Sequence, residues 1–189
     1  LDMRMDTDNN LSAYEVVNNY DYSDLVKVLR DYGEEKYASS IAKNIVKSRE
    51  LKKIETTVDL VEIIKKSMPM KEQRDGHPAR KTFQAIRIEV NNEIKPLENT
   101  IFTSIQCLKS QGRLCVITFH SLEDRAVKNA MIDAKGKCTC PSDLPYCVCG
   151  AESQGNIITR MPIIATQKEQ DENSRSKSAK LRIFEKKGV

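Results

Sequence analysis

The sequence predicts an α/β fold in which a small all-helical module precedes part of an α/β sheet. Residues 12–68 carry apolar side chains at helical spacing, with several capping signals between them. Residues 114–119 instead form a continuous apolar run with β-branched members. Such a run is typical of a strand buried on both faces, as in a parallel sheet, so we expect the fold to change character between these regions.

Composition excludes several classes of protein. About a quarter of the 189 residues are Leu, Ile, Val or Phe, above the roughly 20% below which disorder is expected. No apolar run approaches the ~18 residues of a membrane helix, and no secretion signal is recognisable. The net charge of +4 does not by itself identify a nucleic-acid binder. Six cysteines are too few for a secreted disulfide scaffold, so a reducing, cytoplasmic setting is expected.

Capping signals mark the helices of the first part. Ser12 and Glu15 have the spacing of a capping box, and Thr57 is positioned to cap a later helix. Gly33 follows a helical stretch, where a left-handed residue is favoured, so we expect it to adopt that conformation.

The second part begins after a polar segment, 71–79, which is predicted to be a loop. A long helix with one apolar stripe follows, and Pro96 predicts either a kink or a restart within it. Ser121 is positioned to cap the helix after the first strand, and later strands are expected at 157–164 and 181–185.

Polar side chains gather where the first strand gives way to the next helix. They are His120, Ser121, Glu123, Asp124 and Arg125. Ligands of open α/β sheets bind at the carboxyl ends of strands, and histidine, carboxylates and arginine can handle protons, amines and phosphates. The alternative is a helix N-cap with acids matched to the helix dipole and one salt bridge.

Four cysteines lie close together, with the spacing C-x-C, six residues, C-x-C: Cys138, Cys140, Cys147 and Cys149. Four thiolates can hold zinc, although this is not the usual spacing. Free thiols or oxidation to disulfides are the alternatives. Cys107 and Cys115 lie among apolar residues and are expected to be buried.

Basic residues cluster around 80–87 and in 175–187. Such clusters either contact phosphates or form a solvated face.

His77 precedes the long helix and either orients a ligand or serves the turn. Asp2, Arg4 and Asp6 alternate and are interpreted as a surface ion pair. No two glycines are separated by one residue, so the chain has neither a G-x-G loop nor a P-loop.

Six segments in a fixed order carry a family resemblance: Leu1-Asp2-Met3-Arg4-Met5-Asp6, Tyr32-Gly33-Glu34-Glu35, His77-Pro78-Ala79, Thr82-Phe83-Gln84-Ala85-Ile86-Arg87-Ile88, Phe119-His120-Ser121-Leu122-Glu123-Asp124-Arg125 and Ser178-Ala179-Lys180-Leu181-Arg182. With these the chain resembles the RsmH (MraW) family. Its members are S-adenosylmethionine-dependent methyltransferases that modify N4 of a cytidine in bacterial 16S ribosomal RNA. Departures are mild: Asn173-Ser174-Arg175 stands where the family tends to have Asn-Pro-Arg, and Arg80-Lys81 where it has Thr-Arg.

The resemblance implies a partial class I (Rossmann-like) methyltransferase sheet preceded by an inserted all-helical domain. Residues 1–76 would be the helical insert, which recognises RNA, together with the segment leading into it. Residues 77–189 would supply the last helices and strands five to seven, with the Cys-rich loop 138–149. The family's Gly-rich cofactor loop is absent, so the chain is expected to be a C-terminal part, inactive alone, whose S-adenosylmethionine site lies mostly elsewhere.

For the activity that the resemblance implies, the residues of this chain suggest candidate roles. The catalytic candidates, expected to line the target-base pocket, are His120, Ser121, Glu123 and Asp124. The candidates for contact with 16S ribosomal RNA are Arg80, Lys81, Arg87, Arg125, Arg175, Lys177 and Lys180. A non-catalytic RNA-binding or zinc-bound structural module is the alternative. A partial sheet would also expose an unpaired edge, which favours homodimerisation.

Overall fold

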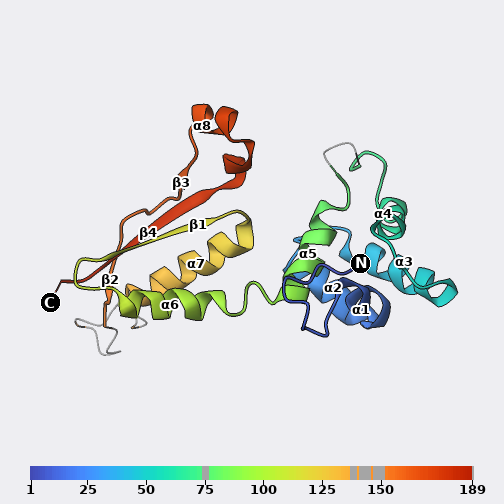
Figure 1. Cartoon of the computed structure of the whole chain (residues 1–189), viewed down its shortest axis with the longest axis horizontal. Helices are drawn as coiled ribbons and strands as arrows, with labels where there is room; N and C mark the ends of the chain where they lie inside the picture. Colours follow the sequence, from blue (N-terminus) through green and yellow to red (C-terminus); the bar gives the residue numbers. More distant parts are fainter. Residues whose placement is uncertain (74–76, 137–139, 141–145, 147–151, 189) are drawn as a thin grey trace. The chain divides into compact units, whose positions relative to one another are not determined.

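A computed structural model describes residues 1–73, 77–136, 140, 146 and 152–188, and the chain divides into two compact units, Leu1–Glu93 and Ile94–Val189 (Figure 1). Each unit has its own hydrophobic core. This division differs from the predicted one after residue 76, because the helix that follows the loop packs into the first core. In the described part of the chain no helix is long and apolar enough to cross a membrane.

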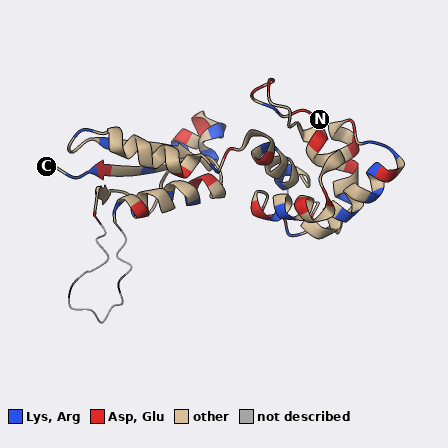
Figure 2. Cartoon of the chain, turned by 90° about the horizontal axis from the view of Figure 1, so that it is seen from below, with Lys and Arg blue, Asp and Glu red and all other residues tan. Residues whose placement is uncertain are grey.

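The described part of the first unit consists of five helices: α1 (Ala13–Asn19), α2 (Tyr22–Asp31), α3 (Ala38–Leu51), α4 (Thr57–Lys66) and α5 (Arg80–Asn91). The predicted capping box of α1 is confirmed for Ser12, whose side chain accepts a hydrogen bond from the Glu15 amide, while the Glu15 carboxylate accepts from Asn19. The predicted cap of α4 is one residue too late: Thr56 is the N-cap and forms a capping box with Asp59. Figure 2 shows basic and acidic residues interspersed along these helices.

Gly33 is needed for space rather than for a left-handed backbone. The residue with positive φ after α2 is Glu34, at 47°, so the conformational prediction for Gly33 was wrong. A Cβ at Gly33 would lie 2.7 Å from the Leu29 carbonyl oxygen and 2.9 Å from that of Lys81. Glycine therefore lets α2 and α5 approach closely.

The first residues of the chain form an ordered loop held by arginine. The Arg4 guanidinium pairs with both carboxylate oxygens of Asp2, at 2.5 and 2.9 Å, and also donates to the carbonyls of Thr7 and Asn9. This contact holds the pKa of Asp2 at about 2. The interpretation of this segment as an ion pair is confirmed. Asn91 joins the loop to α5 by donating to the Met3 carbonyl, at 2.9 Å.

The second unit contains, within its described residues, α6 (Leu97–Cys107), β1 (Arg113–Thr118), α7 (Ser121–Ala134), β2 (Gly155–Ile157), β3 (Ile163–Ile164), α8 (Gln167–Glu172), a 3-10 helix η1 (Ser174–Ser178) and β4 (Lys180–Lys186). The long helix predicted before β1 restarts rather than kinks. Asn92, in the left-handed conformation, ends α5, and Pro96 precedes α6. The strand expected at 157–164 is two short strands on either side of a connection.

The sheet is small and antiparallel, with strand order β1-β4-β2 and β3 paired to β4. One face packs under α6 and α7, where Phe184, Ile105 and Met131 are fully buried. The prediction that β1 is buried on both faces was wrong. Its alternate residues are exposed, including Ile117 at 59% and Cys115, because no helix of the described second unit covers that face. Cys107, expected to be buried, is also exposed.

Candidate functional site

The junction between β1 and α7 brings the predicted catalytic side chains together. β1 ends at Thr118, two residues separate it from α7, and α7 begins at Ser121. His120, rather than the predicted Ser121, is the N-cap, because its imidazole accepts from the Glu123 amide. Histidine is an unusual residue at this position, where Ser, Thr, Asp and Asn are preferred.

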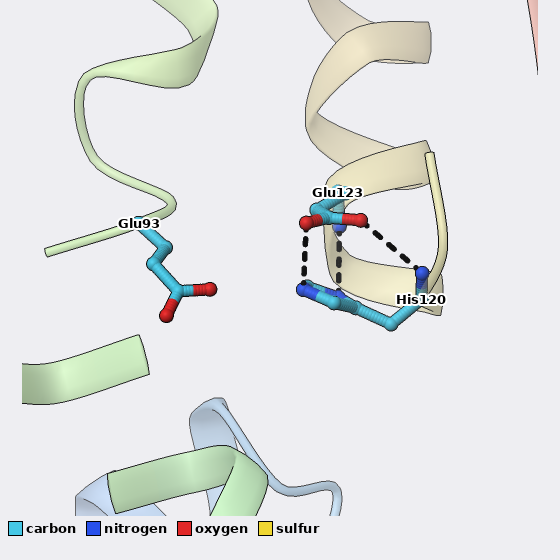
Figure 3. Close-up of side chains that lie close together, drawn as sticks. All are labelled: Glu93, His120 and Glu123. Atoms are coloured by element: carbon cyan, nitrogen blue, oxygen red, sulfur yellow. Dashed lines mark hydrogen bonds and ion pairs between the residues drawn. The ribbon is translucent and has the colours of Figure 1, made fainter. Parts of the chain in front are cut away.

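His120 and Glu123 form a reciprocal capping arrangement (Figure 3). His120 Nδ1 accepts from the Glu123 amide at 3.3 Å, and Glu123 Oε2 accepts from the backbone amides of Phe119 and His120 at 2.8 and 3.2 Å. An accepting Nδ1 carries no proton, so a neutral ring holds its proton on Nε2. That atom is buried, lies 3.1 Å from Glu123 Oε1 and makes no hydrogen bond of good geometry in the described part of the chain.

Glu123 is held as a carboxylate. Partial burial would raise its pKa, but the adjacent His120 side chain and hydrogen bonds from the Phe119 and His120 amides outweigh that effect and lower the pKa to about 2. Its position in the first turn of α7 also places negative charge at the favourable end of the helix dipole. The junction therefore presents an ionised acceptor beside an imidazole at neutral pH.

Asp124 is bound to an arginine that the sequence analysis did not single out. Arg182 of β4 donates through Nε and Nη2 to the two carboxylate oxygens, at 2.6 and 2.9 Å, and both residues are buried. The Lys180 ammonium lies 3.8 Å away. The bonds from Arg182 lower the pKa of Asp124. Because both oxygens are engaged, Asp124 fastens α7 to the central strand and thereby positions the junction.

The alternation of buried and less buried residues along β4 could have revealed the role of Arg182. Arg182 and Phe184 occupy the same face of that strand, and Phe184 is fully buried against the helices. An arginine on a buried strand face requires an acidic partner. Asp124, near the start of α7, was available for that role.

The predicted RNA contacts lie in both units. Arg80, Lys81 and Arg87 belong to α5, Arg125 to α7, Arg175 and Lys177 to η1, and Lys180 to β4. Several of them already have protein partners. Arg87 forms a bidentate pair with Glu93, at 2.8 Å to each oxygen, Lys81 donates to the Glu34 carbonyl, and the Lys180 ammonium lies 3.8 Å from Asp124. Arg80, Arg175 and Lys177 are exposed, as a phosphate contact requires.

His77 serves the turn before α5, where its Nδ1 accepts from the Ala79 amide at 3.4 Å. It also lines a cavity of about 320 Å³ in the first unit, beside Arg80 and Lys81.

Of the predicted zinc ligands, Cys138, Cys147 and Cys149 lie outside the described residues, and Cys140 is half-buried. Three of the four residues of the zinc prediction thus lie outside the described structure.

Comparison with known proteins places the whole chain in one family. The profile of the MraW methylase family matches residues 1–187. Among curated proteins, ribosomal RNA small subunit methyltransferase H 2 of Agathobacter rectalis is 52% identical over 187 residues. Proteins named ribosomal RNA small subunit methyltransferase H from Clostridium botulinum (strain Kyoto) and Fusobacterium nucleatum are 54% and 52% identical over 186 residues. Each match covers 98% of this chain but only 59–60% of the relative.

Proposed function

Because this chain belongs to the MraW methylase family, we propose that it is the C-terminal portion of an S-adenosylmethionine-dependent enzyme that methylates N4 of a cytidine in bacterial 16S ribosomal RNA. The observation that carries the proposal is the family match over residues 1–187, together with relatives named for methylation of small-subunit ribosomal RNA. The chain spans about 60% of the length of those relatives, which supports a portion rather than the whole enzyme.

The glycines that the structure describes do not form a cofactor cradle. A loop that approaches a nucleotide-like ligand uses glycines whose missing side chains leave room for it. Here a Cβ at Gly33, Gly112, Gly136 or Gly155 would lie under 3.0 Å from this chain's own atoms. These glycines serve internal packing. We therefore assign no S-adenosylmethionine contact to the described residues and expect the chain to be inactive by itself.

The junction supplies groups suited to a target amine. Methylation of N4 replaces one N–H by a methyl group, so the amine must be oriented and its proton must leave. We assign orientation of the amine to His120, Ser121 and the ionised Glu123. Asp124 acts through Arg182, as a positioning residue. A base can reach such a pocket only when it is unstacked from its neighbours.

The remaining assignments concern the RNA strand and the cell compartment. Arg80, Lys81 and Arg87 in the first unit, and Arg125, Arg175, Lys177 and Lys180 in the second, are proposed to contact the backbone of the small-subunit RNA. If they do, affinity falls steeply with salt as counterions are released. A cytoplasmic location follows from this substrate.

Calorimetric titration with S-adenosylmethionine tests the proposal. The chain of 189 residues and a version extended upstream are titrated side by side. We expect binding by the extended protein only, together with methylation of 16S ribosomal RNA. Binding by the shorter chain would mean that its own residues form the cofactor site. An extended protein that neither binds the cofactor nor methylates RNA would overturn the proposal.

A further inference from the structure

A basic cavity in the second unit lies apart from the β1–α7 junction. Its volume is about 160 Å³. It is lined by residues from the second half of α7, from the end of β2 and the connection after it, and from β4: Lys128, Met131, Ile132, Lys135, Ile157, Arg160 and Arg182. The lining thus combines four cations with three apolar side chains. None of Lys128, Lys135 and Arg160 belongs to the predicted RNA contacts.

The charge of this cavity is not balanced by its own walls. Arg182 is paired with Asp124, but none of the described residues that line the cavity is acidic. Lys128, Lys135 and Arg160 are exposed, and in the described part of the chain none of them forms an ion pair. Three cations therefore surround one cavity whose floor includes the buried Met131, and such a concentration of positive charge attracts an anion.

The size of the cavity indicates which kind of anion it takes. Sites that enclose a whole small molecule measure roughly 300–1,000 Å³. This cavity is smaller and therefore suits one charged group of a larger ligand. Lys128 and Lys135 are seven residues apart on α7, about 10 Å along its axis. The two lysines are therefore attached to the backbone farther apart than the width of one phosphate, a spacing that suits a strand carrying phosphates in succession.

We propose that this cavity holds a backbone phosphate of an RNA strand, with Ile132 and Ile157 against the sugar. The inference rests on the proposed function, since it takes the ligand to be RNA. Arg125, already assigned to RNA, lies three residues before Lys128, and residues at that spacing are neighbours on a helix surface. The cavity thus extends the RNA track along α7, away from the target base.

Binding of a fluorescent single-stranded RNA oligonucleotide tests the proposal, measured by anisotropy at several salt concentrations without cofactor. The test variant of the full chain carries Lys128→Ala, Lys135→Ala and Arg160→Ala. The control variant carries Lys95→Ala, Lys109→Ala and Lys187→Ala, which removes the same charge from exposed positions of the same unit. Lys135 is the C-cap of α7, so its removal could also change stability. Urea unfolding of each variant measures that change, and a second test variant that retains Lys135 is measured beside the first.

We expect the test variant to bind roughly tenfold more weakly or worse. The slope of log affinity against log salt should shrink by about 0.7 for each phosphate that the variant no longer neutralises. Equal affinity and slope for the test and control variants would overturn the inference while leaving the proposed function intact, because methylation by the extended protein is measured separately. Displacement of RNA by inorganic phosphate or cytidine monophosphate at the same concentration as RNA would assign the cavity to a free anion instead. The inference would also be overturned if the chain bound no RNA.

Discussion

His120 has two separable properties at the start of α7: it caps the helix, and it presents an imidazole beside the Glu123 carboxylate. The substitution His120→Asn separates them, because asparagine is a strong N-cap residue but has no imidazole. We expect His120→Asn in the upstream-extended protein to lower the methylation rate more than tenfold while the free energy of unfolding changes by less than about 0.5 kcal/mol.

Single-turnover methylation and urea unfolding measure the two properties. His120→Ala is the matched variant, and it should lose about 1 kcal/mol of stability in addition to the rate. A rate for His120→Asn equal to that of the unaltered protein would leave His120 as a cap alone.

Glu123 makes stability depend on acidity. Its pKa is lowered from 4.5 to about 2 in the folded chain, so the carboxylate stabilises the fold above pH 4.5. That contribution is lost as pH falls from 4.5 toward 2, because the unfolded chain binds a proton in this range that the folded chain does not. We expect Glu123→Gln to be less stable than the unaltered chain at pH 7, with a smaller loss on acidification.

Urea unfolding at a series of pH values checks this expectation. Glu172→Gln, at an exposed position of α8, is the control and should leave the acid profile unchanged. Parallel profiles for the Glu123→Gln variant and the unaltered chain would contradict the role given to this carboxylate.

At the scale of the elements, the packing of α2 on α5 depends on the absence of one side chain. Gly33→Ala places a Cβ 2.7 Å from a backbone oxygen of α2 and 2.9 Å from one of α5. Neither atom can rotate away, so the helices must separate. We expect a loss of about 1–3 kcal/mol, in the range of overpacked cores. Gly188→Ala meets no atom nearer than 3.6 Å and should be neutral in the same urea titration.

At the scale of the whole molecule, the exposed face of the sheet is the surface that most favours association between copies of this chain. Cys115, Ile117 and Ile163 are exposed there, the last two at 59% and 51%, and Leu181 and Ile183 lie between them. β1 is also an edge strand in the described sheet. Exposed apolar faces and unpaired edges favour association between copies.

We therefore expect the chain to self-associate as its concentration rises, as light scattering after size exclusion can measure. Ile117→Lys should reduce that association, since a charge on an edge strand opposes pairing. Val58→Lys, at an exposed apolar position of α4 in the first unit, is the control and should have no effect. Association unchanged by Ile117→Lys would locate the interface elsewhere.

Local signals in the sequence determined much of this protein. Capping residues located the starts of α1, α4 and α7 to within one residue, because neighbours along the chain decide where a helix begins. Six short segments in a fixed order pointed to the family that the profile match confirms. The grouping of His120, Glu123 and Asp124 at one junction was also predictable, because all three lie within five residues of one another.

Other features were decided only by the tertiary structure. The pair of Asp124 with Arg182 joins residues 58 positions apart, and the basic cavity joins α7 to the connection after β2. The exposure of Ile117 depends on which elements cover the sheet, and the place of α5 depends on the core that it enters. Periodicity reports which residues share a face of one element, whereas the partner of that face is set by contacts between segments distant in the sequence.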